Sequence, residues 1–310
     1  MASYTKETTR FLSADGKTQV AAFFYSPTGD APKAVIQISH GMCEYIGRYE
    51  PTIEVLAAAG FAVCGNDHLG HGYTGEPKDY GFFAEKDGWQ LVLKDLKTMN
   101  DLLHSQFPGT PVFLLGHSMG SFYGRYFAEK FPEAIAGLII SGTGGPGALF
   151  SAGKTLASLL AKLKGNRYVS RLMVNVSTGS YCKGLETDNS GNAWLSRDPA
   201  VWEKYDADPM CGFSFTVSAY RDMLTAYCHV NDKAWAQRMK KDLPILIYSG
   251  DKDPVGEFGK GVQAVNDMLL AAGAEDVTLR LYPGARHEMH NETNKEEVFA
   301  LIGEWIGARS

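Results

Sequence analysis

The chain has 310 residues, of which 45% are hydrophobic and 21% are charged, and its formal net charge is −5. This composition is typical of one large globular domain, or of a domain that carries an insertion, and excludes a disordered chain. The negative net charge argues against a general nucleic-acid binder. The N-terminus has no apolar core of the signal-peptide type and no run of 18 apolar residues occurs, so we expect neither a secretory leader nor a transmembrane helix.

The cysteines indicate a reducing compartment. Their number is odd and no two of them form a C-x-x-C motif, which supports neither a disulfide framework nor a zinc site. We therefore expect a cytoplasmic protein. The five residues are Cys43, Cys64, Cys182, Cys211 and Cys228.

The first half of the chain alternates apolar runs with helical patterns. Residues 7–13 and 18–26 flank the turn Asp15–Gly16 and predict a β-hairpin. Continuous apolar runs predict strands that are covered on both faces; they lie at 34–41, 61–67, 111–116 and 135–142. Apolar residues at helical spacing predict the helices between them, at 48–60, 88–107 and 121–131. Such alternation predicts right-handed βαβ units and a mostly parallel sheet.

The alternation stops after Ser141 and resumes near residue 243. Two further strands are expected at 243–251 and 277–284, and two helices at 259–273 and 295–307. Because the middle of the chain has no clear strand, we interpret residues 145–215 as a mainly helical cap. The core would then consist of residues 1–144 and 216–310.

The segment Gly116-His117-Ser118-Met119-Gly120 fits the G-x-S-x-G pattern of a nucleophile elbow. The pattern alone is weak, but here it follows an apolar strand and opens a helix, which is the context that the elbow requires. The two glycines suit a tight turn with strained backbone. We therefore predict that Ser118 is a nucleophile rather than part of a structural glycine loop.

A serine hydroxyl needs a base, and the base needs an acid to orient it. Asp251 and Asp253 follow one late strand, and His287 and His290 follow the next. Residues that follow neighbouring parallel strands share one edge of the sheet, and the order Ser, Asp, His is the order expected here. We favour Asp253, whose loop is stiffened by a proline, and leave Asp251 as the alternative that caps the turn. We favour His287 over His290.

An oxyanion needs two N–H donors. One is expected from Met119, directly after the nucleophile. The other should come from the loop after an early strand, where Met42 follows Gly41 in "SHGMCEY".

Five motifs together resemble one known family. "SHGMCEYIGRYE", "NDHLGHGYTGE", "GHSMGS", "YSGDKDPV" and "YPGARHEMHNE" are similar to the monoglyceride lipase and lysophospholipase branch of the α/β-hydrolases, and the resemblance spans nearly the whole chain. It extends to the cap segment "LSRDPAVWEKYDADPM" at 195–210, whereas the cap from 144 to 185 matches only loosely.

The resemblance implies an α/β-hydrolase fold with an inserted cap, the triad Ser118, Asp253 and His287, and the oxyanion donors Met42 and Met119. It further implies that polar residues hold the glycerol end of the substrate; these correspond to Glu44, Arg48, Tyr205 and His290. From the residues alone, Glu44 and Arg48 have a second interpretation, as an ion pair that ties the loop to the cap.

The cap helix near 155–167 has leucines on one face. The region from Ala134 to Leu185 contains basic residues and no acidic residue, which suggests a lid that touches anionic lipid transiently. We favour the alternative, in which the leucines pack on the core and acidic residues further along the cap offset the charge. The leucines are Leu156, Leu159, Leu160 and Leu163, and the acidic residues are Glu186, Asp188, Asp198, Glu203, Asp206 and Asp208.

The motif "DHLGHG" at 67–72 offers Asp67, His68 and His71 as metal ligands, but we interpret it as a turn after a strand. We assign His117 to support of the elbow and not to the role of base. The chain has no P-loop, and we expect no cofactor and no metal.

We predict an enzyme that hydrolyses carboxylic esters through an acyl-enzyme, with monoacylglycerol or lysophospholipid as the substrate class. One alternative is a short-chain carboxylesterase or an aminopeptidase on the same fold, since a fold does not fix its chemistry. A second is a non-catalytic ligand-binding protein on a hydrolase scaffold. The sequence predicts no particular oligomeric state.

Overall fold

The computed structural model describes residues 4–183, 185 and 191–310. Its centre is an eight-stranded sheet in the order β1-β2-β4-β3-β5-β6-β7-β8. β1 and β2 form the predicted antiparallel hairpin, and β2 pairs with β4 in the antiparallel sense. The six strands β3 to β8 run parallel to one another. The strands are β1 (Tyr4–Leu12), β2 (Gln19–Pro27), β3 (Val35–Ser39), β4 (Ala62–Asn66), β5 (Val112–His117), β6 (Gly137–Ser141), β7 (Ile245–Gly250) and β8 (Val277–Tyr282).

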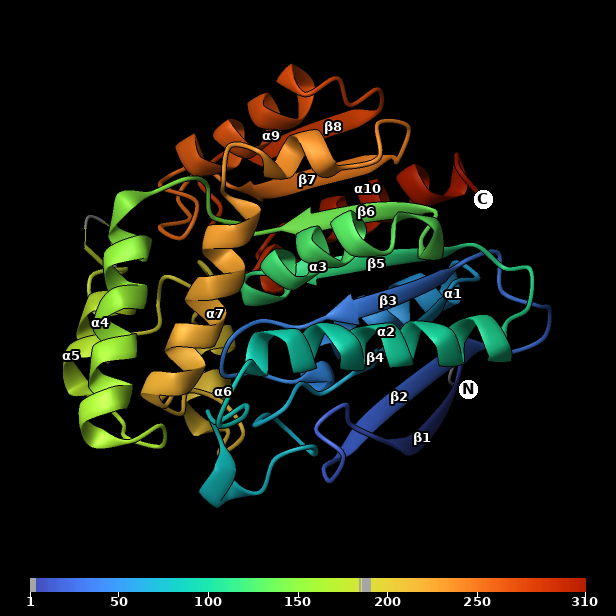
Figure 1. Ribbon diagram of the computed structural model, residues 1–310. Helices are drawn as coiled ribbons and strands as arrows, with labels where there is room; N and C mark the ends of the chain where they lie inside the picture. The colour runs from blue at the N-terminus through green and yellow to red at the C-terminus, as the bar shows by residue number, and fades with distance from the viewer. Residues whose placement is uncertain (1–3, 184, 186–190) are drawn as a thin grey trace.

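Helices cover both faces of the sheet (Figure 1). An apolar cluster packs α2, α3, α8 and α9 on one face, and a second cluster packs α1 and α10 on the other. The central strands β3 to β7 are buried along their whole length, which explains their continuous apolar sequences. The helices are α1 (Glu50–Ala58), α2 (Gly88–Gln106), α3 (Met119–Lys130), α8 (Trp235–Arg238), α9 (Lys260–Ala271) and α10 (Lys295–Gly307).

Between β6 and β7 the described residues add no strand to the sheet. This segment forms helices beside the carboxyl ends of the strands (Figure 1). α4 packs mainly against α7, and α7 also contacts α2 and α3 of the core. The helices are α4 (Ala148–Lys164), α5 (Arg171–Ser177), α6 (Pro199–Ala207) and α7 (Val217–Val230). The mainly helical character of this region agrees with the sequence, whereas its boundaries at 145 and 215 stay a prediction.

Two helices begin two residues away from the expected position at the edge that carries the site. The helix expected from 121 begins at Met119, because the turn between β5 and this helix consists of Ser118 alone. The helix expected from 48 begins at Glu50, after a short 3₁₀ turn at Ile46–Tyr49. No helix in the described part of the chain combines the length and apolar character needed to cross a bilayer.

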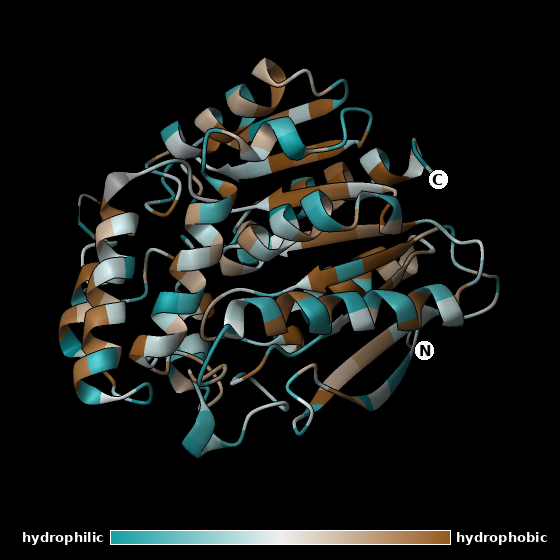
Figure 2. Ribbon diagram, in the orientation of Figure 1, coloured by the Kyte–Doolittle hydropathy of each residue, from teal (hydrophilic) through white to brown (hydrophobic). Residues whose placement is uncertain are grey.

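Hydropathy follows the layers (Figure 2). The strands of the central sheet are strongly apolar, while the outward faces of the helices mix polar and apolar residues. Because β3, β5, β6, β7 and β8 run parallel, the loops that follow them meet at one edge of the sheet. The predicted site residues before residue 120 and after residue 250 come from these loops.

Candidate active site

Ser118 stands alone between β5 and α3, in a backbone conformation that non-glycine residues rarely adopt. Its φ is 53° and its ψ is −121°. Its N–H donates a hydrogen bond to the Ser141 carbonyl oxygen at 2.9 Å, and its side chain is partly exposed. Strained geometry of this kind persists only where the surroundings impose it, and it projects the side chain out of the turn.

The glycines of the elbow are required by close backbone contacts. A Cβ at Gly120 would overlap the carbonyl oxygen of Ser39 at the end of β3. A Cβ at Gly116 would overlap the carbonyl oxygen of Gly120. The helix α3 can therefore approach the ends of β3 and β5 closely only because both positions lack a side chain.

His287 and Asp253 form a buried pair. The Nδ1–H of His287 donates to Asp253 Oδ2 at 2.9 Å, and the exposed fractions of the two residues are 2% and 0%. Asp253 also accepts hydrogen bonds from Ser249 Oγ at 3.0 Å and from the Val255 N–H at 2.9 Å. The carboxylate is thus fixed on three sides and holds the imidazole in one orientation.

Electrostatics favour the protonated form of His287. Burial lowers the pKa of His287, but the charge and hydrogen bond of Asp253, with smaller effects of the Glu288 and Glu44 charges, outweigh burial, so the pKa lies above the ordinary value of 6.5. An imidazole that can accept and stabilise a proton is what a general base requires.

Gly142 lies between the base and the elbow. A Cβ at this position would lie 3.0 Å from His287 Cε1. Gly142 directly follows Ser141, whose carbonyl oxygen accepts the Ser118 N–H. The His287 ring and Ser118 therefore both lie against the end of β6. On the other side, a Cβ at Gly41 would lie 3.2 Å from Ser118 Cβ, so the loop after β3 also borders the serine.

The two predicted oxyanion donors flank the serine. Met119 is the first residue of α3, so its N–H has no acceptor within the helix. Met42 follows Gly41 in the loop that borders Ser118. The helix N-terminus adds a partial positive charge at this position.

The geometry separates the paired alternatives. Asp251 Oδ1 accepts the Gly284 N–H at 2.7 Å and so caps the turn after β8. His290 is buried, and its ring stacks on Tyr49 with 4.4 Å between ring centroids. His287, not His290, contacts an aspartate, and Asp253, not Asp251, contacts a histidine. The catalytic roles of Ser118, Asp253 and His287 stay predictions.

Glu44 and Arg48 belong to a buried ion network. Arg48 donates to both carboxylate oxygens of Glu288, at 2.5 and 2.7 Å, and to Glu44 Oε2 at 2.9 Å. Glu44 Oε1 accepts from the Gly41 N–H at 2.5 Å and from the Tyr49 hydroxyl at 2.8 Å. Burial raises the pKa of Glu44 against the opposing charge of Arg48. Burial alone would raise the pKa of Glu288, but the charge and hydrogen bonds of Arg48 outweigh burial and lower this pKa to about 2.

The same network reaches the cap. The Arg48 guanidinium lies over the Tyr205 ring of α6 at 4.8 Å, and the Tyr205 hydroxyl donates to the Cys43 carbonyl oxygen at 3.1 Å. These contacts correspond to the interpretation of Glu44 and Arg48 as an ion pair that ties the loop to the cap. A role for Glu44, Arg48, Tyr205 and His290 in substrate binding stays a prediction.

Comparison with known proteins identifies the family to which the chain belongs. A family model described as "Serine aminopeptidase, S33" matches residues 30–294. The chain belongs to this serine aminopeptidase S33 family. It is 28% identical to human monoglyceride lipase over 302 residues, which cover 96% of this chain and 90% of that protein. It is 26% identical to a monoacylglycerol lipase of Mycolicibacterium smegmatis, with 99% of both chains covered.

A solved structure of similar shape is a thermostable carboxyl esterase from Bacillus coagulans in complex with glycerol. It matches with a TM-score of 0.92 and 29% identity over 98% of this chain and 99% of that chain. The resemblance to the monoglyceride lipase-like α/β-hydrolases, and the α/β-hydrolase fold that it implied, are thereby confirmed.

Two neighbours of the base in this S33-family protein were not identified from the sequence. Glu288, directly after His287, holds Arg48 as described above. Trp194, from the cap segment before α6, packs its ring 4.9 Å from the His287 ring, and its carbonyl oxygen accepts the His287 N–H at 3.3 Å. The acidic residue beside the base was visible in the sequence, but its partner lies 240 residues away. Nothing in the sequence around Trp194 indicated its contact.

The residues of the "DHLGHG" motif hold the turn after β4. Asp67 accepts the N–H groups of Ile46 and Tyr73 at 2.9 and 2.8 Å. Throughout the described ranges, no group of three or more histidine, cysteine or acidic side chains is arranged to hold a metal ion.

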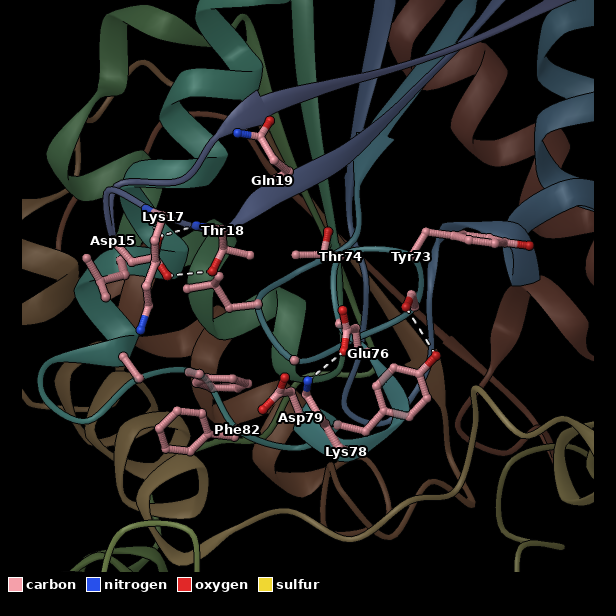
Figure 3. Close-up of a pocket in the computed structure, with 18 of the residues that line it drawn as sticks. Asp15, Lys17, Thr18, Gln19, Tyr73, Thr74, Glu76, Lys78, Asp79 and Phe82 are labelled. Atoms are coloured by element: carbon pink, nitrogen blue, oxygen red, sulfur yellow. Dashed lines mark hydrogen bonds and ion pairs between the residues drawn. The ribbon is translucent and has the colours of Figure 1, made fainter.

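A separate hollow of about 1,000 Å³ lies between the β1–β2 turn and the loops before α2 (Figure 3). None of the predicted site residues lines it. Several of its polar side chains interact with one another: Asp15 accepts from Thr18, Lys78 pairs with Glu76, and Arg167 pairs with Asp79. We assign it no part in the chemistry at Ser118.

Proposed function

We propose that this protein hydrolyses carboxylic esters of lipids through an acyl-enzyme on Ser118, with monoacylglycerol or lysophospholipid as the substrate class. The observation that carries the proposal is the strained Ser118 elbow beside the buried His287–Asp253 pair. The family and its relatives support a carboxylic ester hydrolase that acts on lipid esters. The esterase of similar structure, solved with glycerol, supports a glycerol-like alcohol.

The proposed reaction begins with transfer of the Ser118 Oγ proton to His287 Nε2. The Oγ attacks the ester carbonyl carbon, and the N–H groups of Met42 and Met119 bind the oxyanion that forms. His287 then donates its proton to the leaving alcohol as the carbon–oxygen bond breaks. In the second half, His287 takes a proton from water and the hydroxide attacks the acyl carbon. The bond between the acyl carbon and Ser118 Oγ then breaks, the carboxylic acid leaves, and His287 returns the proton to Oγ.

For the alcohol end of the substrate, we propose the wall formed by Glu44, Arg48, Tyr205 and His290. Among these, Arg48 and Tyr205 form one of the contacts between core and cap. Because the network fixes the Gly41 N–H and the cap at once, we expect it to set the shape of the headgroup pocket. A polar pocket of this kind provides hydrogen bonds that an apolar acyl channel lacks.

The substrate class is tested by a hydrolysis panel with purified protein. We expect kcat/KM to be highest for monoacylglycerols or a lysophospholipid, and lower by about 10-fold or more for short nitrophenyl esters and a prolyl-arylamide. Activity confined to short esters would indicate a carboxylesterase. Activity confined to the arylamide would indicate an aminopeptidase, as the family description permits. Tight lipid binding without any turnover would indicate the non-catalytic alternative.

We also propose that residues 145–215 act as a cap whose outer face touches membranes transiently. Leu156 and Leu160 of α4 pack on the core, as favoured from the sequence, but Leu159 and Leu163 are 52% and 67% exposed. α4 and α5 carry further exposed apolar and basic residues; these are Leu149, Leu172, Val176, Lys162, Lys164 and Arg171. Of the offsetting acidic residues, Glu186 and Asp188 lie outside the described residues. Apolar side chains rimmed by basic ones suit the surface of an anionic bilayer.

We expect the double variant Leu159→Ser, Leu163→Ser to bind anionic phosphatidylserine-containing vesicles at least about threefold more weakly, because each buried side chain adds to partitioning. Co-sedimentation measures the binding. Leu270→Ser is the matched control, since Leu270 is also 52% exposed but lies on α9. Equal loss in both variants, or no binding by the wild type, would contradict membrane contact through the cap.

Finally, we propose a cytoplasmic location without a cofactor. Within the described part of the chain, the five cysteines form no disulfide with one another, which is how a reducing compartment would keep them. The proposed ester chemistry needs only the side chains and backbone groups named above.

A further inference from the structure

Three histidines, His40, His68 and His71, form a buried cluster that the proposed reaction leaves unused. Their exposed fractions are 1% or less, and the His40 ring lies 4.1 Å from the His68 ring and 5.1 Å from the His71 ring. The cluster lies under the loop after β3, which carries Met42. Buried imidazoles are costly unless their nitrogens are paired, so the partners of each nitrogen indicate what the cluster does.

The proton on His40 is located by its hydrogen bonds. Its Nε2 accepts the backbone N–H of His68 at 2.9 Å, which leaves the proton on Nδ1. That Nδ1–H donates to the carbonyl oxygen of Gly41 at 2.8 Å. The Gly41 carbonyl and the Met42 N–H belong to the same peptide unit, and in a trans peptide these two groups point in opposite directions. By holding the carbonyl on one side, His40 directs the Met42 N–H to the other.

His71 holds the next peptide unit in the same manner. Its Nδ1–H donates to the Leu69 carbonyl oxygen at 2.9 Å, and its Nε2 accepts the Cys43 N–H at 3.2 Å. The peptide units before and after Met42 are thus both fixed by an imidazole. Burial lowers the pKa of His40 well below its ordinary value and that of His71 to about 4, so both rings stay neutral and keep the lone pair on Nε2 near neutral pH.

Cys43 shows why such support is needed. Its φ is 57°, a conformation that is unfavourable for a residue with a Cβ. Its carbonyl oxygen accepts hydrogen bonds from the Gly212 N–H and the Tyr205 hydroxyl, each at 3.1 Å. The loop therefore departs from relaxed backbone geometry at the residue after Met42, and external bonds hold it there.

We propose that His40 and His71 are positioning residues that aim the Met42 N–H at the oxyanion in the transition state. The inference rests on the proposed function, because it assigns these residues to the oxyanion site of the same reaction. They touch neither substrate nor the reacting atoms. Their effect should therefore be confined to steps in which negative charge develops on the carbonyl oxygen.

The test uses His40→Phe and His71→Phe in the full chain, assayed with the best substrate of the panel. We expect kcat to fall by about 10- to 100-fold with KM changed by less than about threefold, because a misaligned oxyanion donor costs less than its complete loss. The Ki of a trifluoromethyl ketone, whose adduct carries an oxyanion, should rise by a similar factor. His40→Asn keeps a donor near the Nδ1 position and should recover most of the lost kcat.

His68→Leu is the matched control. The His68 side chain is equally buried, but its Nε2 contacts Ser39 Oγ and not the loop from Gly41 to Cys43. We expect it to lower the melting temperature at least as much as His40→Phe, and to lower kcat by less than about threefold. Thermal unfolding of every variant separates loss of folded protein from loss of rate.

The outcomes are distinct. A kcat loss that merely follows the melting temperature across all three positions, or a change in KM alone, would overturn the positioning role. If Ser118→Ala is inactive but both phenylalanine variants keep the full kcat of the wild type, the positioning role is overturned and the proposed function stands. Turnover that survives Ser118→Ala would overturn the proposed function, and the inference with it.

Discussion

Ser118→Ala is expected to lower kcat/KM for lipid-ester hydrolysis by about 10⁵- to 10⁶-fold, because no other group can form the acyl-enzyme once Oγ is removed. KM should change little if the acyl chain and headgroup are bound by other residues. The measurement is steady-state hydrolysis of monoacylglycerol by wild type and variant, with product quantified by chromatography. Residual activity above about 1% of wild type would contradict the role of Ser118 as nucleophile.

Ser118→Gly provides a control for folding. At a φ of 53° and a ψ of −121°, glycine relieves strain that alanine and serine both carry, so Ser118→Gly should be as inactive as Ser118→Ala but about 1 kcal/mol more stable. Urea unfolding of both variants measures the difference. Equal stabilities would show that the elbow stores no such strain.

Asp253→Asn is expected to lower kcat by about 10⁴-fold, because an amide can neither hold the Nδ1–H form of His287 nor stabilise its charged form. It should also move the pH dependence. The base works when neutral, so kcat/KM of the wild type should fall as pH drops through the His287 pKa, which lies above 6.5. Without the Asp253 carboxylate, burial is opposed only by the smaller effects of the Glu288 and Glu44 charges, so the pKa of the imidazole should fall. The acidic limb of the residual activity should therefore shift to lower pH.

Asp251→Asn is the matched control for this experiment. Asp251 lies two residues away and caps the turn at Gly284 instead of contacting His287. We expect a kcat loss below about 10-fold and an acidic limb at the wild-type position. If the two variants behaved alike, or if Asp253→Asn left the pH profile unchanged, His287 would not depend on Asp253 for its function.

The grouping of site residues at one edge of the sheet could be predicted because it follows from local sequence patterns. Each apolar run predicted a buried strand, and parallel strands bring the loops that follow them to one edge. This was sufficient to expect Ser118 near an aspartate and a histidine. The choice of Asp253 over Asp251 rested on loop length and the following proline, and the structure pairs Asp253 with His287.

What the sequence left undetermined depends on contacts between distant segments. Helical spacing grouped Leu156, Leu159, Leu160 and Leu163 on one face, but only packing decided that two of them turn inward and two remain exposed. The bond between Arg48 and Glu288 joins two loops far apart in the chain. Charge alone cannot select such a partner, because many acidic residues are available.

The histidine cluster illustrates a different limit. In the sequence, His68 and His71 stood beside Asp67 in a pattern that suits metal ligands as well as a turn. The hydrogen bonds favour the turn, since His71 uses Nδ1 to donate to a carbonyl and Nε2 to accept from a backbone N–H, and Asp67 accepts two backbone N–H groups. A nitrogen whose lone pair accepts a hydrogen bond is not free to bind a metal.

The most direct test of Ser118 as the nucleophile is covalent labelling with a fluorophosphonate, followed by proteolysis and mass spectrometry of the labelled peptide. We predict one adduct per chain, on Ser118, which disappears in Ser118→Ala and forms much more slowly in Asp253→Asn. An adduct on another residue, or no adduct under conditions in which the protein hydrolyses esters, would contradict the proposed mechanism.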